Sequence, residues 1–339
     1  MTRKLRTGIF ATIGMLILIL DSKTALSGGL AGVEICTMQV IPALLPFFVL
    51  SILISSAFTG ADIPILRPLG RLCRMPRGSE SLLILGFLGG YPAGAQGICQ
   101  AYQQGQLSKK DAHRLLGFCS NAGPAFLFGI ASAVFPYSWL PWALWAIHIL
   151  SAIGTGAILP GGSKTAVRLP AGKPITLTQA LERAIAIMAK VCGWIILFRM
   201  IQAFLDRWLL WLYPAPTRVA VVGLLELANG CLTLPVIADV GLRAVMCSAF
   251  LSLGGLCVTM QTLSVTAPLG LGMYIPGKII QCSLSVLLTL LLQWIFLPDS
   301  QITPIFPCLI LLLVAFTAIF AAVLHKYEKN SSIPLAVSV

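Results

Sequence analysis

Long apolar runs dominate this chain, and short polar stretches separate them. A helix needs about 20 apolar residues to cross a bilayer, and eight runs, the first of them short, fit that requirement. They cover residues 8–20, 31–58, 116–135, 140–160, 184–212, 242–264, 271–297 and 304–324. The pattern predicts an all-α polytopic membrane protein with about eight transmembrane helices.

Two further apolar segments are interrupted. Residues 81–101 contain the stretch GFLGGYPAGAQG, with five glycines and one proline in twelve positions, and residues 219–237 contain the stretch ELANG. Glycine and proline weaken a helix in lipid because they free backbone groups that lipid cannot satisfy. We expect each segment to be a re-entrant helical hairpin, which enters the membrane and leaves on the same side.

Basic residues give the expected orientation, because Lys and Arg collect in the cytoplasmic loops of membrane proteins. They gather in residues 67–77 and 109–114, on both sides of the first interrupted segment, and again near both termini and in residues 161–183. A hairpin keeps both of its flanks in the cytoplasm, whereas a simple span would not. We expect a multi-pass protein of the cell membrane with cytoplasmic N- and C-termini, whose second hairpin enters from outside.

This order of spans and hairpins predicts two inverted repeats. The first covers residues 31–160 with the hairpin at 81–101, and the second covers residues 184–297 with the hairpin at 219–237. The other segments are an N-terminal extra helix or signal-like segment (1–30), a cytoplasmic linker (161–183), and a terminal helix with a mobile tail (298–339). Inverted repeats with interrupted helices are typical of secondary transporters that bind substrate near the membrane midplane.

Composition supports the membrane assignment. Of the 339 residues, 58% are hydrophobic and only 10% are charged, so the chain lacks the charged surface of a soluble protein. The net charge of +12 comes from clusters between apolar runs, and we expect no nucleic-acid partner. The ten cysteines are scattered without a C-x-x-C pair, so we expect neither a metal site nor a cofactor. No hydrolase or P-loop motif occurs, and we do not expect an enzyme.

The breaks also predict a binding site. A helix that begins inside the membrane directs free N–H groups and partial positive charge at an anion. Candidate residues lie at the first hairpin, in the stretch CSNAGPAFLFG and in the stretch SLGGLCVTMQ: Gly89, Gly90, Tyr91, Pro92, Gly94 and Gln96; Ser120, Asn121 and Gly123; and Ser252, Gly254, Gly255 and Gln261. The alternative is that the glycines only allow helices to pack closely.

Ionisable residues within the apolar runs are further candidates, because their burial in lipid is costly. Arg199 and Lys278 are deep cations that can bind a carboxylate, whereas Lys190 lies near a span end, where a long side chain can reach the membrane surface. Glu226, with Asn229 beside the second break, can accept a proton, a cation or a hydrogen bond from substrate. The alternative for Glu226 is an internal ion pair with Arg199 or Lys278.

Four stretches occur in order along the chain: GFLGGYPAGAQG, LSKKDAHRLLGFCSNAGPAFLFG, LLELANG and SLGGLCVTMQ. Together they resemble the sporulation integral membrane protein YlbJ family, within the nucleoside-transporter and gate-domain group. The resemblance runs from about residue 30 to residue 324, although Leu253 stands where that family tends to carry Phe. It implies a transporter of the outer forespore membrane that moves dipicolinic acid, a small aromatic dicarboxylate, toward the forespore. The open alternatives are a transporter of a nucleoside-like solute and a structural or assembly protein of the spore envelope. The sequence is also compatible with assembly of the chain into a homo-oligomer.

Overall fold

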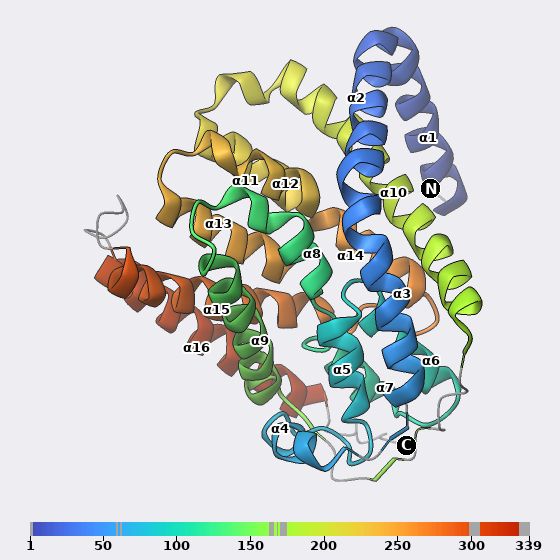
Figure 1. The fold of residues 1–339 in the computed structure, drawn as a ribbon, viewed down its shortest axis with the longest axis vertical. Helices are drawn as coiled ribbons and strands as arrows, with labels where there is room; N and C mark the ends of the chain where they lie inside the picture. Colours follow the sequence, from blue (N-terminus) through green and yellow to red (C-terminus); the bar gives the residue numbers. More distant parts are fainter. Residues whose placement is uncertain are drawn as a thin grey trace, which may run out of the picture.

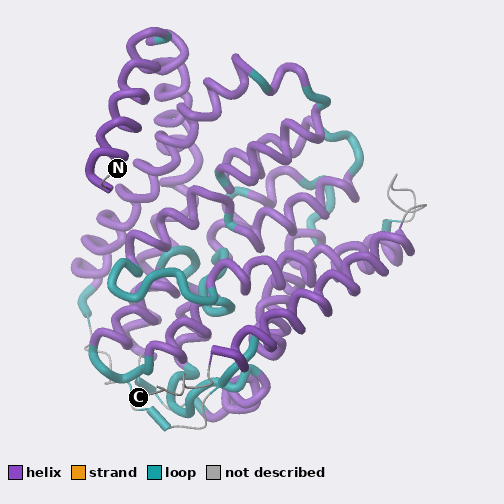
Figure 2. Tube along the Cα trace, turned by 180° about the vertical axis from the view of Figure 1, so that it is seen from behind, coloured by secondary structure: helices purple, strands orange, loops and turns teal. Residues whose placement is uncertain are grey.

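The chain is all-helical. A computed structural model describes residues 3–58, 60–61, 63–162, 166–167, 169, 175–297 and 306–331. No sheet forms among these residues, where the only β-type contact is an isolated bridge between Arg77 and Ala166. Figures 1 and 2 show helices crossing the molecule at several angles, with most loops at its ends. The predicted all-α class is confirmed.

Six helices in the described part of the chain are long and apolar enough to cross a membrane. They are Ser22–Phe58, Leu140–Ile158, Leu177–Trp208, Val240–Val265, Tyr274–Phe296 and Pro307–Lys326. The prediction of about eight was therefore too high. Of the two remaining candidates, residues 8–20 lie in α1 (Arg3–Leu20), whose apolar part is only Leu5–Leu20.

The predicted span at 116–135 was wrong because its backbone is broken. Helix α7 (Lys109–Leu116) ends there, residues 117–123 are non-helical, and only α8 (Pro124–Gly129) and a 3-10 turn (Ala131–Val134) follow. Proline has no N–H and disfavours a helical conformation in the residue before it, and Gly123 is accordingly extended. We call residues 117–123 the break segment.

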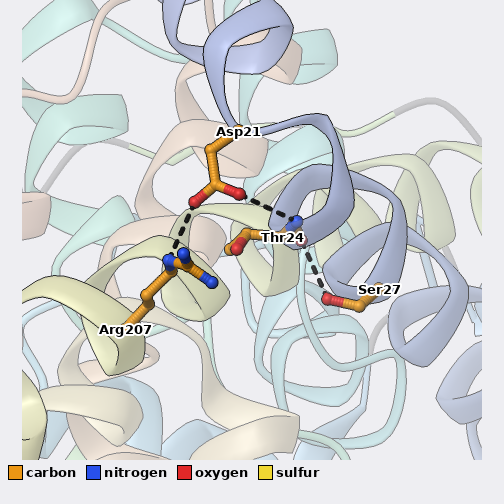
Figure 3. A network of polar contacts seen from close by, with 4 residues as sticks. All are labelled: Asp21, Thr24, Ser27 and Arg207. Carbon is orange, nitrogen blue, oxygen red and sulfur yellow. Dashed lines mark hydrogen bonds and ion pairs between the residues drawn. The ribbon is translucent and has the colours of Figure 1, made fainter.

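The first spanning helix begins earlier than predicted, at residue 22 rather than 31. It joins α2 (Ser22–Ile35), a π-helical turn (Cys36–Val40) and α3 (Ile41–Phe58) into 37 residues. Asp21 caps it: its carboxylate accepts the N–H of Thr24 at 3.3 Å and binds Nε of Arg207 at 3.1 Å (Figure 3). This contact joins the start of α2 to the end of α10 (Leu177–Trp208).

Helices α2 and α10 pack against each other through small residues. A Cβ added at Gly28 would lie 2.8 Å from Cβ of Ala203, and one at Gly32 would lie 2.9 Å from Cα of Ile196. Side chains larger than hydrogen at these positions would force the helices apart. Gly28 and Gly32, which lie outside the predicted breaks, therefore serve the close packing of this helix pair.

Both interrupted segments contain two short helices that pack on each other. Hairpin 1 consists of α5 (Ser81–Leu88) and α6 (Ala93–Gln103), and hairpin 2 consists of α11 (Ala215–Leu225) and α12 (Leu227–Thr233), which ends in a 3-10 turn (Leu234–Val236). With seven to eleven residues, each helix rises at most about 17 Å, roughly half of a bilayer core. Neither hairpin contains a helix that could cross a membrane alone.

The other long helices form a layer beside the hairpins. Helix α15 (Tyr274–Phe296) packs against α9 (Leu140–Ile158) and against α13 (Val240–Leu253), with α16 (Phe306–Ser331) along its other side (Figure 1). Helix α14 (Gly255–Val265) follows α13 after Gly254, whose φ of 73° is left-handed. This turn gives the predicted Gly-Gly break its conformation, because glycine adopts positive φ without a steric penalty.

A buried arginine ties the segments around α4 (Arg67–Leu72) together. Arg114 of α7 is 3% exposed, and its guanidinium donates to the carbonyl oxygens of Cys73, Gly156 and Pro160 at 2.6, 2.5 and 3.1 Å. Burial lowers the pKa of Arg114 to about 10. The end of α4, α7 and the end of α9 are thus joined through one side chain.

Parts of four predicted segments lie outside the described residues, among them residues 1–2 of the N-terminal segment and residues 59 and 62 of the first repeat. In the linker predicted at 161–183 these are residues 163–165, 168 and 170–174, and in the terminal segment they are residues 298–305 and 332–339.

Candidate functional site

The tip of hairpin 1 meets the break segment and the end of α13. Gly90, at φ 69°, lies against Gly123, so that a Cβ added at Gly90 would be 2.9 Å from the Gly123 nitrogen. The next residue, Tyr91, donates its hydroxyl to the carbonyl of Leu251 at 3.4 Å. A Cβ at Gly254 would lie 3.4 Å from Cζ of Tyr91. Three of the predicted breaks therefore come together around Tyr91.

Lys278 lies beside this junction, buried on α15. Its Nζ donates to Oε1 of Gln281 at 2.7 Å and to Oδ1 of Asn121, in the break segment, at 3.3 Å. The ring centroids of Tyr91 and Tyr274 lie 5.2 and 5.7 Å from the same nitrogen, within the range of cation–π attraction. The structure thus brings together the predicted residues Tyr91, Asn121 and Lys278.

Glu226 caps hairpin 2 from within. Its carboxylate accepts the N–H groups of Ala228 at 3.0 Å and Asn229 at 2.6 Å, and its side chain is buried. The free N–H groups at the start of α12 are therefore satisfied by the chain itself. Among the described residues, Glu226 forms an ion pair with neither Arg199 nor Lys278.

Arg199 lies apart from the other predicted residues. Its guanidinium pairs with Oδ2 of Asp206 at 3.7 Å on the same helix, and its backbone packs against Gly28 of α2. It lines neither of the two cavities described below. This position follows from packing, because residue 199 lies where α10 packs on α2, whereas the cavity is lined by residues 183–194 of the same helix.

A cavity of about 650 Å³ lies between α3, hairpin 1, α10 and α14. Its polar walls include Gln96, Gln100 and Gln104 from α6 and its end, Gln261 from α14, and two exposed cations of α10, Arg183 and Lys190. Pro92 and Tyr91 form the part of the lining at the hairpin tip. No carboxylate lines this cavity among the described residues. Its electrostatic character is therefore positive.

A second cavity of about 50 Å³ adjoins the first. The two share Gly89, Tyr91 and Gln261 as lining residues, and the smaller one is also lined by Gly90, Gly123 and Glu226. Six predicted site residues thus surround one small space next to the larger cavity. Tyr91 and Gln261 lie where the two cavities meet.

The remaining predicted residues have packing or local roles in this structure. Gly94 lies against the Cys119 backbone and Gly255 against the Leu224 carbonyl. The hydroxyl of Ser252 donates to the Ser248 carbonyl at 2.8 Å. Two buried polar atoms, Oγ of Ser120 and Nδ2 of Asn229, have no hydrogen-bond partner in the described part of the chain.

Several lining residues were missed from the sequence. Gln96 was predicted, whereas Gln100 and Gln104 were missed. The three recur every fourth residue, which places them on one helical face, and this polar stripe was a usable signal. Arg183 was interpreted as a charge of the 161–183 loop and Lys190 as a cation near a span end, although their spacing of seven residues also places them on one face of α10. No sequence pattern linked Gln281 to Asn121.

Comparisons with known proteins give one distant similarity. Over 123 residues the chain is 34% identical to the sporulation integral membrane protein YlbJ of Bacillus subtilis (strain 168), a match that covers 34% of this chain and 29% of that protein. The chain thus matches less than a third of the length of this relative. No protein-family model and no solved structure matches the chain. Together with its six membrane-length helices, the match identifies a multi-pass membrane protein distantly related to a sporulation integral membrane protein.

Proposed function

We propose that the protein is a secondary transporter of a small organic anion, with dipicolinic acid as the candidate substrate. One observation carries this proposal: the cavity of about 650 Å³ ends at the tip of hairpin 1 and is lined by two cations and, among described residues, by no carboxylate. Ligand sites for small molecules have volumes of about 300–1,000 Å³. The cavity is large enough for an aromatic dicarboxylate.

The chemistry of the walls favours a carboxylate over a nucleoside. Arg183 can bind a carboxylate through two parallel hydrogen bonds, and Lys190 supplies a point charge. Their spacing of seven positions corresponds to about two helical turns, or about 10 Å, so the two cations can attract the two ends of one dianion. The glutamine side chains of α6 add neutral donors and acceptors along the same wall.

The order of helices supports the transporter assignment. A long helix, a short hairpin, a broken helix and a second long helix occur as α3, hairpin 1, α7–α8 and α9, and again as α10, hairpin 2, α13–α14 and α15. Duplicated broken helices are a recurrent feature of secondary transporters. We infer that the two halves are inverted repeats, with the hairpins entering from opposite faces. The similarity to a sporulation protein favours a role in endospore formation.

The proposal is tested by uptake of labelled dipicolinate into proteoliposomes that contain the purified protein. Saturable uptake, together with competition by other small dicarboxylates, is the expected result. Saturable uptake of uridine in place of dipicolinate would favour the nucleoside-like alternative. Absence of any saturable flux would favour a structural role in the spore envelope.

The cavity cations should determine anion affinity. We expect the double substitution Arg183→Gln and Lys190→Gln to weaken dipicolinate binding at least tenfold, because about 1.4 kcal/mol of charge attraction is lost. Equilibrium binding to the purified protein measures the effect. Lys23→Gln, an exposed cation of α2 outside the cavity, is the matched control. Equal affinity in the double variant and the control would contradict an anion site in this cavity.

The topology of hairpin 1 can be tested by chemical labelling. Arg77 lies before hairpin 1 and Gln103 is its last residue, and both are exposed. After replacement of the exposed Cys308 by serine, we expect single cysteines at these two positions to react with an impermeant maleimide from the same side of the membrane. Reaction from opposite sides would mean that the segment crosses the membrane and would exclude the hairpin.

A further inference from the structure

Lys278 connects three parts of the molecule that are distant in sequence. It belongs to α15, its partner Asn121 belongs to the break segment, and the ring of Tyr91 belongs to the tip of hairpin 1. Its side chain is 2% exposed, and it lines neither cavity. Tyr91 separates it from both of them. The ammonium group is therefore enclosed directly behind a residue that faces the candidate solute site.

No acidic group neutralises this ammonium among the described residues. The two oxygens that accept from Nζ belong to the neutral amides of Gln281 and Asn121, and Nε2 of Gln281 in turn donates to Oδ1 of Asn121 at 2.9 Å. A buried charge without a counter-ion is expensive. A buried ionisable residue within a membrane-spanning helix therefore points to a function for its charge.

The other groups near Lys278 that can titrate carry no charge at neutral pH in their ordinary forms. They are the phenols of Tyr91 and Tyr274, the thiol of Cys119 and the imidazole of His148. Both ring nitrogens of His148 are buried without a partner in the described part of the chain. On the helices that pack against α15, four further titratable or charged side chains contact backbone carbonyls elsewhere, namely His113 and Arg114 on α7, Arg243 on α13 and His325 on α16. Asp111 of α7 accepts from Ser108, and Lys109 of that helix is exposed. Lys278 is thus the group at this junction that carries a full charge at neutral pH in its ordinary form.

We propose that Lys278 is the site that carries a coupling proton during transport. This inference rests on the proposed transport function. Lysine, unlike arginine, can gain and lose a proton in a protein interior. The proton is taken up from water on one side of the membrane, held as the ammonium, and released from Nζ to water on the other side, so that one proton moves for each cycle.

The geometry explains how proton and solute could depend on each other. With its proton, Lys278 attracts the faces of Tyr91 and Tyr274 and donates to both amides, which holds the tip of hairpin 1 against the break segment. Without it, the attraction to the rings is lost, and the tip is released. Tyr91 touches both the ammonium and the cavity, so solute in the cavity and the proton on Lys278 act on the same ring. Such coupling is reciprocal: each ligand changes the affinity for the other by the same factor.

The test uses proteoliposomes with an imposed pH gradient and, separately, counterflow of labelled against unlabelled dipicolinate. In the wild type we expect the accumulation ratio to change with the gradient, up to about tenfold per pH unit for one proton. Lys278→Met keeps the length of the side chain but cannot titrate. We expect this variant to show no accumulation in response to the gradient under conditions in which it still carries out counterflow. Lys109→Met, an exposed lysine of α7, should behave as the wild type.

The outcomes separate this inference from the proposed function. Absence of wild-type counterflow would overturn the transport function itself. Counterflow together with an unchanged gradient response in Lys278→Met would overturn only the role of Lys278. If that variant fails to fold, the wild type decides alone: a pH-sensitive dye should report one proton moved per dipicolinate, and uptake without proton movement would overturn the inference.

Discussion

Replacing Gly94 by alanine should separate hairpin 1 from the break segment and abolish transport. A Cβ at this position would lie 3.0 Å from Cα of Gly86 and 3.2 Å from the carbonyl carbon of Cys119, and still closer to the Cys119 oxygen. All of these are backbone atoms, which cannot move aside as a flexible side chain can. Overpacking of a well-packed interior costs about 1–3 kcal/mol, and we expect the upper end of this range.

The measurement is the thermal stability of the detergent-solubilised protein, followed by dipicolinate uptake. Gly193→Ala is the matched control, because nothing lies within 4 Å of a Cβ at Gly193 and alanine is favoured in a helix. We expect the control to be at least as stable as the wild type. If Gly94→Ala matched Gly193→Ala in both assays, the close approach of hairpin 1 to the break segment would be excluded.

Replacing Arg114 by methionine should have a comparably large effect on stability. The substitution removes hydrogen bonds to five carbonyl groups, the shorter ones to Cys73, Gly156 and Pro160 and two of 3.4 Å to Arg74 and Leu159. Hydrogen bonds to a charged donor contribute about 1.5–3 kcal/mol each, and carbonyl groups left buried without a partner add to the loss. We expect destabilisation of at least about 3 kcal/mol and a sharply reduced yield of folded protein.

Two further variants identify the cause of that loss. Lys109→Met removes a cation from the exposed side of the same helix and should leave stability nearly unchanged. Arg114→Lys keeps the charge but lacks the planar fork that reaches several carbonyls at once, so it should recover only part of the stability. Full recovery by lysine would show that charge alone, rather than the set of hydrogen bonds, is what the fold requires.

The sequence predicted the helical class and the positions of the hairpin breaks for a physical reason. Lipid cannot satisfy backbone groups, so a cluster such as Gly89, Gly90 and Pro92 must end a helix whatever surrounds it. Hydropathy was less informative in the 116–135 region. It measures the transfer of side chains into lipid and does not register that Gly123 and Pro124 leave the backbone non-helical.

Side-chain partnerships were the least predictable part of the site. Arg199 and Lys278 looked equivalent in the sequence as deep cations, yet Arg199 pairs with Asp206 on its own helix whereas Lys278 binds amides from two segments. The difference depends on which face of each helix is turned toward hairpin 1. The rotation of each helix about its axis depends on its packing contacts, such as that of Gly28 with α10. A single sequence does not reveal these contacts.

In the transport function proposed above, the depth of the larger cavity would determine where the membrane voltage acts. The cavity extends from Gln104 and Gln106 to Tyr91 at the hairpin tip, and water within it would share the electrical potential of the solution outside. The voltage would then fall across the thin layer of protein beyond Tyr91 instead of across a bilayer core of about 30 Å. One elementary charge that crosses 100 mV changes its energy by about 2.3 kcal/mol. A dianion that travels with one proton still carries a net charge of −1, so the membrane potential itself would drive it across this layer, away from the negative side.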